Sequence, residues 1–357
     1  MKPLKILLGN NTLSMLAGSE TWTRTLALQL KKLGHTVEGF SPELGIISEE
    51  LEKNGIPCFS TIHTSGIRPF SICLEEEHDF SYDVIISNHN HIVDFLRKRF
   101  PKTPIISTIH GVMHFGEEHG KKIIAPEHPS LEGNVSKFIA VSEEVQDKLM
   151  ADYKIDSTII RNFFDVSLFE AKRPISDRPK AFLINTSYAD SSDEEVKVIR
   201  EVAKHYEAKV IAIGQNFTMT ADTMKAIENS DIVIGMGRSV LEGVCAGRLG
   251  IVHGRWGTGG VVCGETINEL RLTNFSGRNS GGKMYTKEEF IEAIDRYYGP
   301  LTIQGGMEYV RTHHNVAFAA ESFIQIARGL INQSEEAEKP VEVLRPYRRA
   351  KDVVQPS

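Results

Sequence analysis

The sequence predicts an α/β protein made of two doubly wound domains that face a central cleft. Strand-like and helix-like segments alternate almost from end to end, and the polar segment 170–180, which contains two prolines, separates one such series from the next. The length of 357 residues fits two domains of roughly 150 residues each. Because doubly wound sheets bind ligands at the carboxyl ends of their strands, we expect the substrate cleft to lie between the domains.

The first series combines short apolar runs, typical of buried parallel strands, with amphipathic segments. Gly34 and Gly55 follow two of these segments and are suitable C-terminal helix caps. Acidic residues follow Ser142, where the helix dipole favours negative charge and a third helix is expected to begin. The predicted strands are 4–8, 35–40, 84–87, 105–109, 138–141 and 157–161, and the first two helices are 20–33 and 48–54.

The second series has the same character and is followed by a long amphipathic segment. Its predicted strands are 181–185, 209–214, 231–235 and 250–253, and its clearest helix is 193–205. The whole pattern predicts a first domain over residues 1–169 and a second one over 170–310. A C-terminal helix over 311–333 is expected to pack back toward the first domain, and the charged segment 334–357 to be a disordered tail.

Composition narrows the function further. The net charge of −6 argues against nucleic acid as the main partner. The four cysteines are widely spaced without a C-x-x-C pair, which fits reduced thiols and a cytoplasmic protein. No apolar run reaches the roughly 18 residues that a membrane-spanning helix needs.

The most informative stretch runs from residue 230 to 254. It has the pattern of a buried strand, a glycine turn, a helix and a second buried strand. Gly235 and Gly237 allow a sharp turn, after which the first N–H groups of the helix are available to an anion. Arg238 stands in the first turn, where the helix dipole disfavours a cation, and Glu242 follows four residues later on the same face. We therefore expect a phosphorylated ligand here.

Five motifs in the right order resemble the GT-B-fold glycosyltransferases, specifically the retaining, nucleotide-sugar-dependent enzymes of family 4. The resemblance covers residue 4 to about residue 329. The motifs are LAGSETWTRTLALQLKKLGHTV, TIHG at 108–111, FIAVSEEV followed by IIRNFFDVSLF, the stretch with Gly235, Gly237, Arg238, Glu242 and Gly247, and NFSGR at 274–278. The last one resembles a motif of the subgroup that carries G-x-G-R.

The resemblance implies two Rossmann-like domains in the GT-B arrangement, with residues 1–169 on the acceptor side and residues 170–310 binding the donor nucleotide. It also implies transfer of a hexose from a UDP- or GDP-sugar, without metal or cofactor. The acceptor would be a glycan or a lipid-linked molecule of surface polysaccharide or glycolipid synthesis. His110 would hydrogen-bond the donor sugar or align the acceptor, and Glu242 would accept hydrogen bonds from the ribose hydroxyls. The implied substrate-binding residues are Gly18, Ser19, Gly237, Arg238, Glu242 and Arg278.

The sequence departs from the family pattern where the diphosphate would bind. The family's E-x7-E pair keeps its second member in Glu242, but Ile234 stands at the first. The loop after the first strand of the second domain, NTSYADSSDEE, is acidic and carries neither of the family's two cations. Either Arg238 replaces them, or nucleotide binding is weak or lost and the chain is an inactive GT-B module that binds a nucleotide sugar or a partner.

Other functions have less support. The histidine-rich segment HFGEEHG at 114–120 matches neither common zinc-binding helix motif, so no metal site is predicted. A nicotinamide dehydrogenase is disfavoured because Val240 stands where the third glycine of G-x-G-x-x-G is required. An epimerase on the same fold would need cleft carboxylates that the sequence does not identify. The basic segment 97–102 leaves open a solvated helix end or a peripheral contact with anionic lipid at the inner membrane face.

Overall fold

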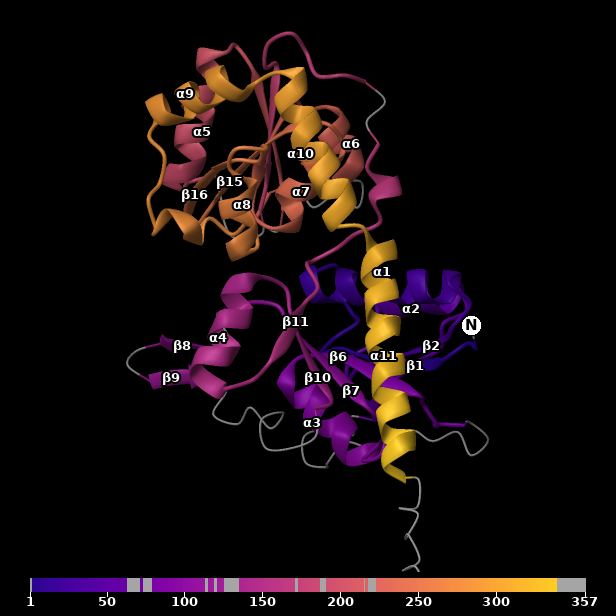
Figure 1. Ribbon diagram of the computed structural model, residues 1–357. Helices are drawn as coiled ribbons and strands as arrows, with labels where there is room; N and C mark the ends of the chain where they lie inside the picture. Colours follow the sequence, from indigo (N-terminus) through magenta and orange to yellow (C-terminus); the bar gives the residue numbers. More distant parts are fainter. Residues whose placement is uncertain are drawn as a thin grey trace, which may run out of the picture.

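Two parallel sheets, each covered by helices, form the two domains of the computed structural model (Figure 1). The structure describes residues 2–62, 71–72, 79–112, 115–118, 121–124, 135–170, 173–186, 191–214, 216–217 and 223–338. The doubly wound α/β class predicted from the sequence is confirmed.

The first domain holds a seven-stranded sheet whose paired strands are all parallel. In spatial order its strands are β11 (Ser157–Ile159), β10 (Lys137–Ala140), β7 (Ile105–Ile109), β6 (Val84–Asn88), β1 (Lys5–Gly9), β2 (Thr36–Phe40) and β3 (Cys58–Phe59). Two short antiparallel pairs lie apart from it: β4 (Thr61–Ile62) with β5 (Ser71–Ile72), and β8 (Phe115–Glu118) with β9 (Lys121–Ile124).

Side chains alternate between the two faces of this sheet, so each face has its own core. Ile6 and Leu8 of β1 pack with Trp22 on one face, while Leu7 packs with Val93 on the other. The helices of this domain are α1 (Gly18–Lys32), α2 (Ile46–Lys53), α3 (Asn90–Arg99) and α4 (Glu143–Tyr153). The hydroxyl of Ser142 accepts a hydrogen bond from the Val145 N–H at 3.4 Å and so caps α4, as the sequence predicts.

The second domain holds a five-stranded sheet with one antiparallel edge strand. Its strands are, in spatial order, β13 (Lys209–Ile213), β12 (Ala181–Asn185), β14 (Ile232–Gly235), β15 (Leu249–Gly254) and β16 (Gly257–Val261). Its helices are α5 (Glu194–His205), α6 (Thr223–Glu228), α7 (Arg238–Cys245), α8 (Ile267–Leu270), α9 (Lys287–Tyr297) and α10 (Pro300–His313), with 3-10 turns η2 (Val166–Leu168), η3 (Arg271–Thr273) and η4 (Arg278–Ser280). The edge strand β16 was not among the strands predicted from the sequence.

The chain passes between the domains twice, and the two passages pair with each other. Phe164 and Asn315 form a parallel β-bridge, in which the Phe164 N–H donates to the His314 carbonyl and the Val316 N–H to the Phe164 carbonyl, both at 3.0 Å. Phe163 is buried in the core of the first domain, whereas Phe164 is buried in a core of the second. The first passage therefore precedes the boundary expected after residue 169.

The last helix, α11 (Val316–Glu338), leaves the second passage and runs down along the first domain (Figure 1, yellow). Its apolar face, including Ala320 and Phe323, packs into the core that contains Trp22 of α1. The tail predicted over 334–357 thus begins inside a helix that extends to Glu338, because the helical backbone continues past the apolar face. Residues 339–357 lie outside the described part.

No helix in the described part of the chain is both long and apolar enough to cross a membrane.

Candidate functional site

The carboxyl ends of the strands in both sheets approach each other between the domains, and the predicted site residues lie at these ends. Gly18 and Ser19 open α1, which follows β1, and His110 directly follows β7. On the other side, Gly237 and Arg238 lie at the start of α7, which follows β14. Residues far apart in the sequence are brought together because α1 and α7 both begin at this interface.

The turn into α7 depends on glycine at two positions. Gly237 has φ 53° and ψ −128°, a conformation that favours glycine, and its N–H donates to the Phe275 carbonyl at 2.8 Å. At Gly235 a Cβ would lie 2.6 Å from the Asn185 carbonyl oxygen of the neighbouring strand. Two glycines thus let α7 begin immediately after the buried strand β14.

Arg238 forms a contact across the interface. Its Nη1 donates to the hydroxyl of Thr21 on α1 at 2.8 Å, and its Nη2 donates to Oε1 of Glu242 at 2.9 Å. The Arg238 and Glu242 side chains are only 21% and 12% exposed, so their ion pair is shielded from water and stronger than a surface pair. Its Nε is buried without a partner in the structure. Two of the five guanidinium N–H groups are thus engaged, by Thr21 and by Glu242, and the arrangement pairs the two residues that the sequence assigns to the donor.

His110 lies at the carboxyl end of β7, beside α1. Its Nε2 is 3.0 Å from Oδ1 of Asn88, the last residue of β6. The Trp22 ring packs against the imidazole edge-on, with ring centroids 5.3 Å apart. Two neighbours from different elements therefore hold the imidazole at the carboxyl end of the sheet.

Arg278, the remaining predicted substrate-binding residue, pairs with a carboxylate of the first domain. Its guanidinium binds the carboxylate of Glu144, at the N-terminus of α4, with Nε–Oε1 and Nη2–Oε2 distances of 2.8 and 2.5 Å. Nearby, Glu143 accepts hydrogen bonds from both Arg161 and Arg271 at 2.7 and 2.8 Å. Burial alone would raise the pKa of Glu143, but the hydrogen bonds and charges of these arginines outweigh it and lower the pKa. Arg278 thus belongs to an ion-pair cluster that joins the two domains.

The acidic loop before α5 supplies no cation to the site in its described part. Residues 187–190 lie outside the described part. Lys197, the nearest lysine on the following helix, pairs with Glu194 at 3.2 Å and is 56% exposed. At the end of β15, His253 is buried beside Glu195, with 3.9 Å between Nε2 and Oε2, and burial lowers the pKa of this histidine to about 4. His253 is therefore neutral at physiological pH and contributes no positive charge.

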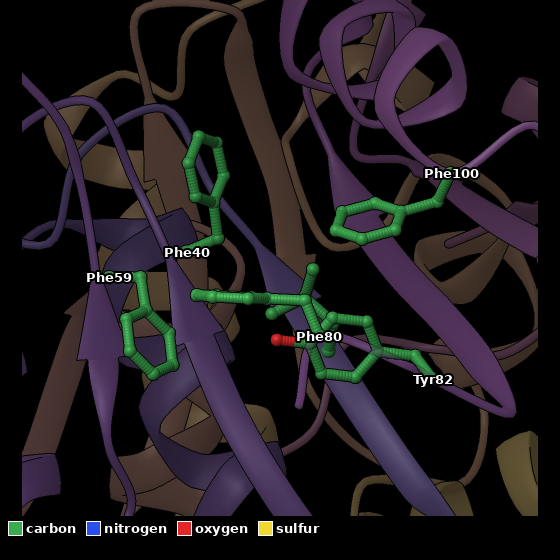
Figure 2. Close-up of a pocket in the computed structure, with 6 residues that line it drawn as sticks. Phe40, Phe59, Phe80, Tyr82 and Phe100 are labelled. Carbon is green, nitrogen blue, oxygen red and sulfur yellow. The ribbon is translucent and has the colours of Figure 1, made fainter. Parts of the chain in front are cut away.

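A cavity elsewhere in the first domain is lined by aromatic rings (Figure 2). It has a volume of about 10 Å³, barely enough for one water molecule. Its one polar lining group, the Tyr82 hydroxyl, already donates to the buried Glu38 carboxylate at 2.6 Å. The lining residues are Leu7, Phe40, Phe59, Phe80, Tyr82 and Phe100. This cavity is too small and too apolar for a nucleotide.

No group of three or more His, Cys, Asp or Glu side chains with metal-binding geometry occurs among the residues that the structure describes. The histidine-rich segment 114–120 is not part of that search, because its side chains lie outside the described part. The basic segment after α3 is partly neutralised within its own helix, since Arg97 and Lys98 pair with Asp94 at 2.8 and 2.7 Å.

The structure adds three polar residues that sequence reasoning missed: Thr21, Thr23 and Asn88. Asn88 had a recognisable signal, since it is a polar residue at the carboxyl end of a buried apolar strand. The threonines had none, because threonine in a helix is common and only the packing of the domains shows which hydroxyls meet a partner.

One known protein family matches part of the chain. Residues 16–168, less than half of the chain, match the model of glycosyltransferase family 4, so the first domain is a family 4-like domain. A search of curated protein sequences found no match.

Solved structures resemble nearly the whole chain. A glycosyltransferase from Rickettsia africae has 17% identity and a TM-score of 0.62, with 92% of this chain and 99% of that one covered. Anabaena HepE in complex with UDP and glucose has 12% identity and a TM-score of 0.62, covering 91% and 100%. Sucrose-phosphate synthase from Thermosynechococcus elongatus has 12% identity and a TM-score of 0.58, covering 92% and 100%. At these identities the likeness establishes the fold, which is GT-B.

Proposed function

We propose that the chain is a glycosyltransferase that transfers a sugar from a nucleoside diphosphate sugar to an acceptor. The contact between Arg238 of α7 and Thr21 of α1 carries the proposal most directly, because it brings a cation at a helix N-terminus to the interface of the two sheets. The match of the first domain to family 4 and the UDP complexes of Anabaena HepE support the same class of donor.

The proposed donor site assigns a role to each residue around this contact. Arg238 and the positive ends of the α7 and α1 helix dipoles would stabilise the negative charge that develops on the leaving diphosphate. Glu242 would exchange its bond to Arg238 for the ribose hydroxyls. His110 would hydrogen-bond the donor sugar or align the acceptor. We include Gly18, Ser19 and Gly237 as backbone neighbours of the phosphates and propose that the reaction needs no metal.

Arg278 has the least support as a substrate ligand, because the Glu144 carboxylate already binds its guanidinium. It could reach a ligand only if that ion pair opened. We therefore keep a substrate role for Arg278 only for a state in which the domains have separated.

The finer parts of the proposal come from the family resemblance. They are a UDP- or GDP-hexose donor, retention of anomeric configuration, and a glycan or lipid-linked acceptor in surface polysaccharide or glycolipid synthesis. A cytoplasmic location, with peripheral contact at the inner membrane face through the basic segment 97–102, belongs to the same set.

An inactive GT-B module is the second candidate, and the site itself supplies the observation in its favour. Arg238 and Glu242 satisfy each other, and the described part of the loop before α5 brings no further cation. Such a module would bind a nucleotide sugar or a protein partner without transferring the sugar.

Turnover separates the two candidates. The chain is incubated with UDP-, GDP- and ADP-sugars, and release of the nucleoside diphosphate is measured with and without a mixture of glycan acceptors. We expect release from one donor class, and a loss of at least 100-fold in Arg238→Ala, because removal of one charge-stabilising group costs about that much. Arg296→Ala, which removes an exposed arginine of α9, is the matched control. Binding of a nucleotide sugar without release of any diphosphate would support the inactive module instead.

A further inference from the structure

A chain of hydrogen bonds connects His110 to the backbone of α1. The imidazole Nε2 lies 3.0 Å from Asn88 Oδ1, and Asn88 Nδ2 lies 3.2 Å from the Thr23 hydroxyl. That hydroxyl lies 2.9 Å from the Ser19 carbonyl oxygen, one turn earlier in the helix. Asn88 and Thr23 are 0% and 1% exposed, so water does not compete for these groups.

The donor and the acceptor of every hydrogen bond in this series follow from its last group, the Ser19 carbonyl. A backbone carbonyl can only accept, so the Thr23 hydroxyl must donate its single proton to Ser19. The oxygen of Thr23 is then left as an acceptor, and it requires the amide nitrogen of Asn88 on its side. The carbonyl oxygen of Asn88 is thereby turned toward the imidazole. The hydrogen-bond partners thus fix the orientation of the Asn88 amide, whose oxygen and nitrogen have similar shapes.

We propose that Thr23 and Asn88 are positioning residues that hold neutral His110 in the Nε2–H tautomer. An Asn88 carbonyl oxygen can only accept, so the nitrogen facing it must carry the proton. Nδ1 is then the hydrogen-bond acceptor of the ring. The edge of Trp22 against the same ring limits its rotation and prevents the two nitrogens from exchanging places.

The tautomer determines what kind of ligand atom His110 can meet, and this step rests on the proposed function. An accepting Nδ1 suits a hydroxyl group of the donor sugar or of the acceptor, which has a proton to donate. It does not suit a phosphate or carboxylate oxygen, which would need a proton on the imidazole. A ligand that contacts Nδ1 would therefore do so through a donating group such as a sugar hydroxyl.

The tautomer can be measured without any substrate. Histidine labelled with 15N is incorporated into the full chain, and two-bond correlations from the ring protons to both nitrogens are recorded at about pH 8, where ordinary histidines are neutral. The chain has 13 histidines, so the His110 signals are identified as those missing from His110→Gln. We expect the His110 pattern of the Nε2–H form. The Nδ1–H pattern in the unmodified chain would overturn the proposal without any variant.

Two substitutions at Thr23 and one control test the relay. Thr23→Val keeps the shape but removes the oxygen that orders the amide, so the Nδ1–H form should become populated. Thr23→Ser keeps the hydroxyl and should keep the Nε2–H form. Thr25→Val removes the same type of hydroxyl-to-carbonyl bond, from Thr25 to the Thr21 carbonyl at 2.7 Å, and should leave the tautomer unchanged. An unaltered Nε2–H pattern in Thr23→Val would show that the relay does not set the tautomer.

The tautomer that these spectra report does not depend on whether the proposed function is correct. If the tautomer is as expected and no nucleotide sugar is turned over, the relay stands and the enzyme assignment fails. If turnover is found, Thr23→Val should lower kcat at least several-fold relative to Thr25→Val while the affinity for the nucleoside diphosphate stays the same. A loss of nucleotide affinity with an unchanged tautomer would instead point to a general structural role of Thr23.

Discussion

Arg278 is a residue at the domain interface for which the sequence and the structure suggest different partners. The sequence predicts it as a substrate ligand because it ends the NFSGR motif, yet its guanidinium binds Glu144 of the other domain in two places. Both side chains are at least three-quarters buried. A paired arginine with this geometry favours a role in joining the domains, although it leaves the substrate role for test.

Exchanging the two charges distinguishes these roles. Arg278→Glu should destabilise the domain interface through repulsion of Glu144, and adding Glu144→Arg should restore it, with a coupling of about 1–3 kcal/mol in the free energy of unfolding. Urea unfolding of the four chains measures this coupling. If the double exchange recovers stability but nucleotide affinity stays lost, Arg278 contacts the ligand. If both recover, Arg278 acts only between the domains.

The buried strands are the elements that the sequence predicts best. Runs such as residues 231–235 are short, apolar and bounded by polar residues or glycine, so their place in a parallel sheet follows from composition. The antiparallel edge strand β16, in the glycine-rich run Gly257–Val261, carries no such signal. Its position depends on pairing with β15, a contact that composition cannot reveal.

The segment that leads into the second domain depends on one buried carboxylate. Asp231 pairs with Arg173 at 3.0 Å and accepts N–H bonds from Ser176, Lys180 and Ala181. Burial would raise the pKa of Asp231, but these hydrogen bonds and the Arg173 charge lower it. The carboxylate thus fixes the segment 173–180 to the start of β12.

Removing the Asp231 carboxylate should strongly lower the free energy of unfolding. Asp231→Ala leaves the N–H groups of Ser176, Lys180 and Ala181 without their acceptor and removes the charge partner of Arg173, so we expect a loss of about 3 kcal/mol in the free energy of unfolding. Chemical denaturation of the second-domain transition measures it. Asp295→Ala, which removes a carboxylate that binds the exposed side of Tyr206, is a matched control expected to cost less than about 1 kcal/mol. Equal losses in the two variants would contradict the account of the segment.

At the scale of the whole molecule, the two passages between the domains meet at a buried histidine. His314 Nδ1 lies 2.6 Å from the Asn162 carbonyl, so this nitrogen carries the proton. Burial lowers the pKa of His314 to about 4, although the hydrogen bond to Asn162 acts in the opposite direction. The imidazole is therefore neutral in the folded protein above about pH 4. Below that pH the ring takes up a proton, and the resulting cation would be buried away from water.

The pH dependence of stability follows with a definite sign. Between the unfolded pKa of about 6.5 and the folded value of about 4, the unfolded chain binds more protons at this site than the folded one. Stability should therefore be unaffected by His314 above about pH 6.5, and should fall by as much as about 1.4 kcal/mol per pH unit as the pH drops toward 4. Comparing urea unfolding of the chain and of His314→Gln across this range isolates the contribution. Parallel curves for the two proteins would contradict it.

The sequence predicts the two domains and their strand ends, but not the contacts between the domains. Two βα series and a polar linker predict two doubly wound domains, and the position of each series predicts which strand ends face the cleft. Contacts between the domains were not predictable, since Thr21 and Arg238 are 217 residues apart and no local pattern connects them. The point between Phe163 and Phe164 at which the chain passes from one domain to the other could not be predicted either. The two adjacent residues are of the same type, although they pack into different cores.

We propose that a nucleotide binds between the domains at Arg238 and Glu242, and calorimetric titration measures that binding. UDP, GDP and ADP are titrated into the full chain, Arg238→Ala, Glu242→Gln and the control Arg296→Ala. One nucleotide should bind the chain and the control equally, and should bind both site variants at least tenfold more weakly, a difference of about 1.4 kcal/mol or more. Equal affinity of that nucleotide for all four proteins would contradict the claim, and so would the absence of binding to the unmodified chain.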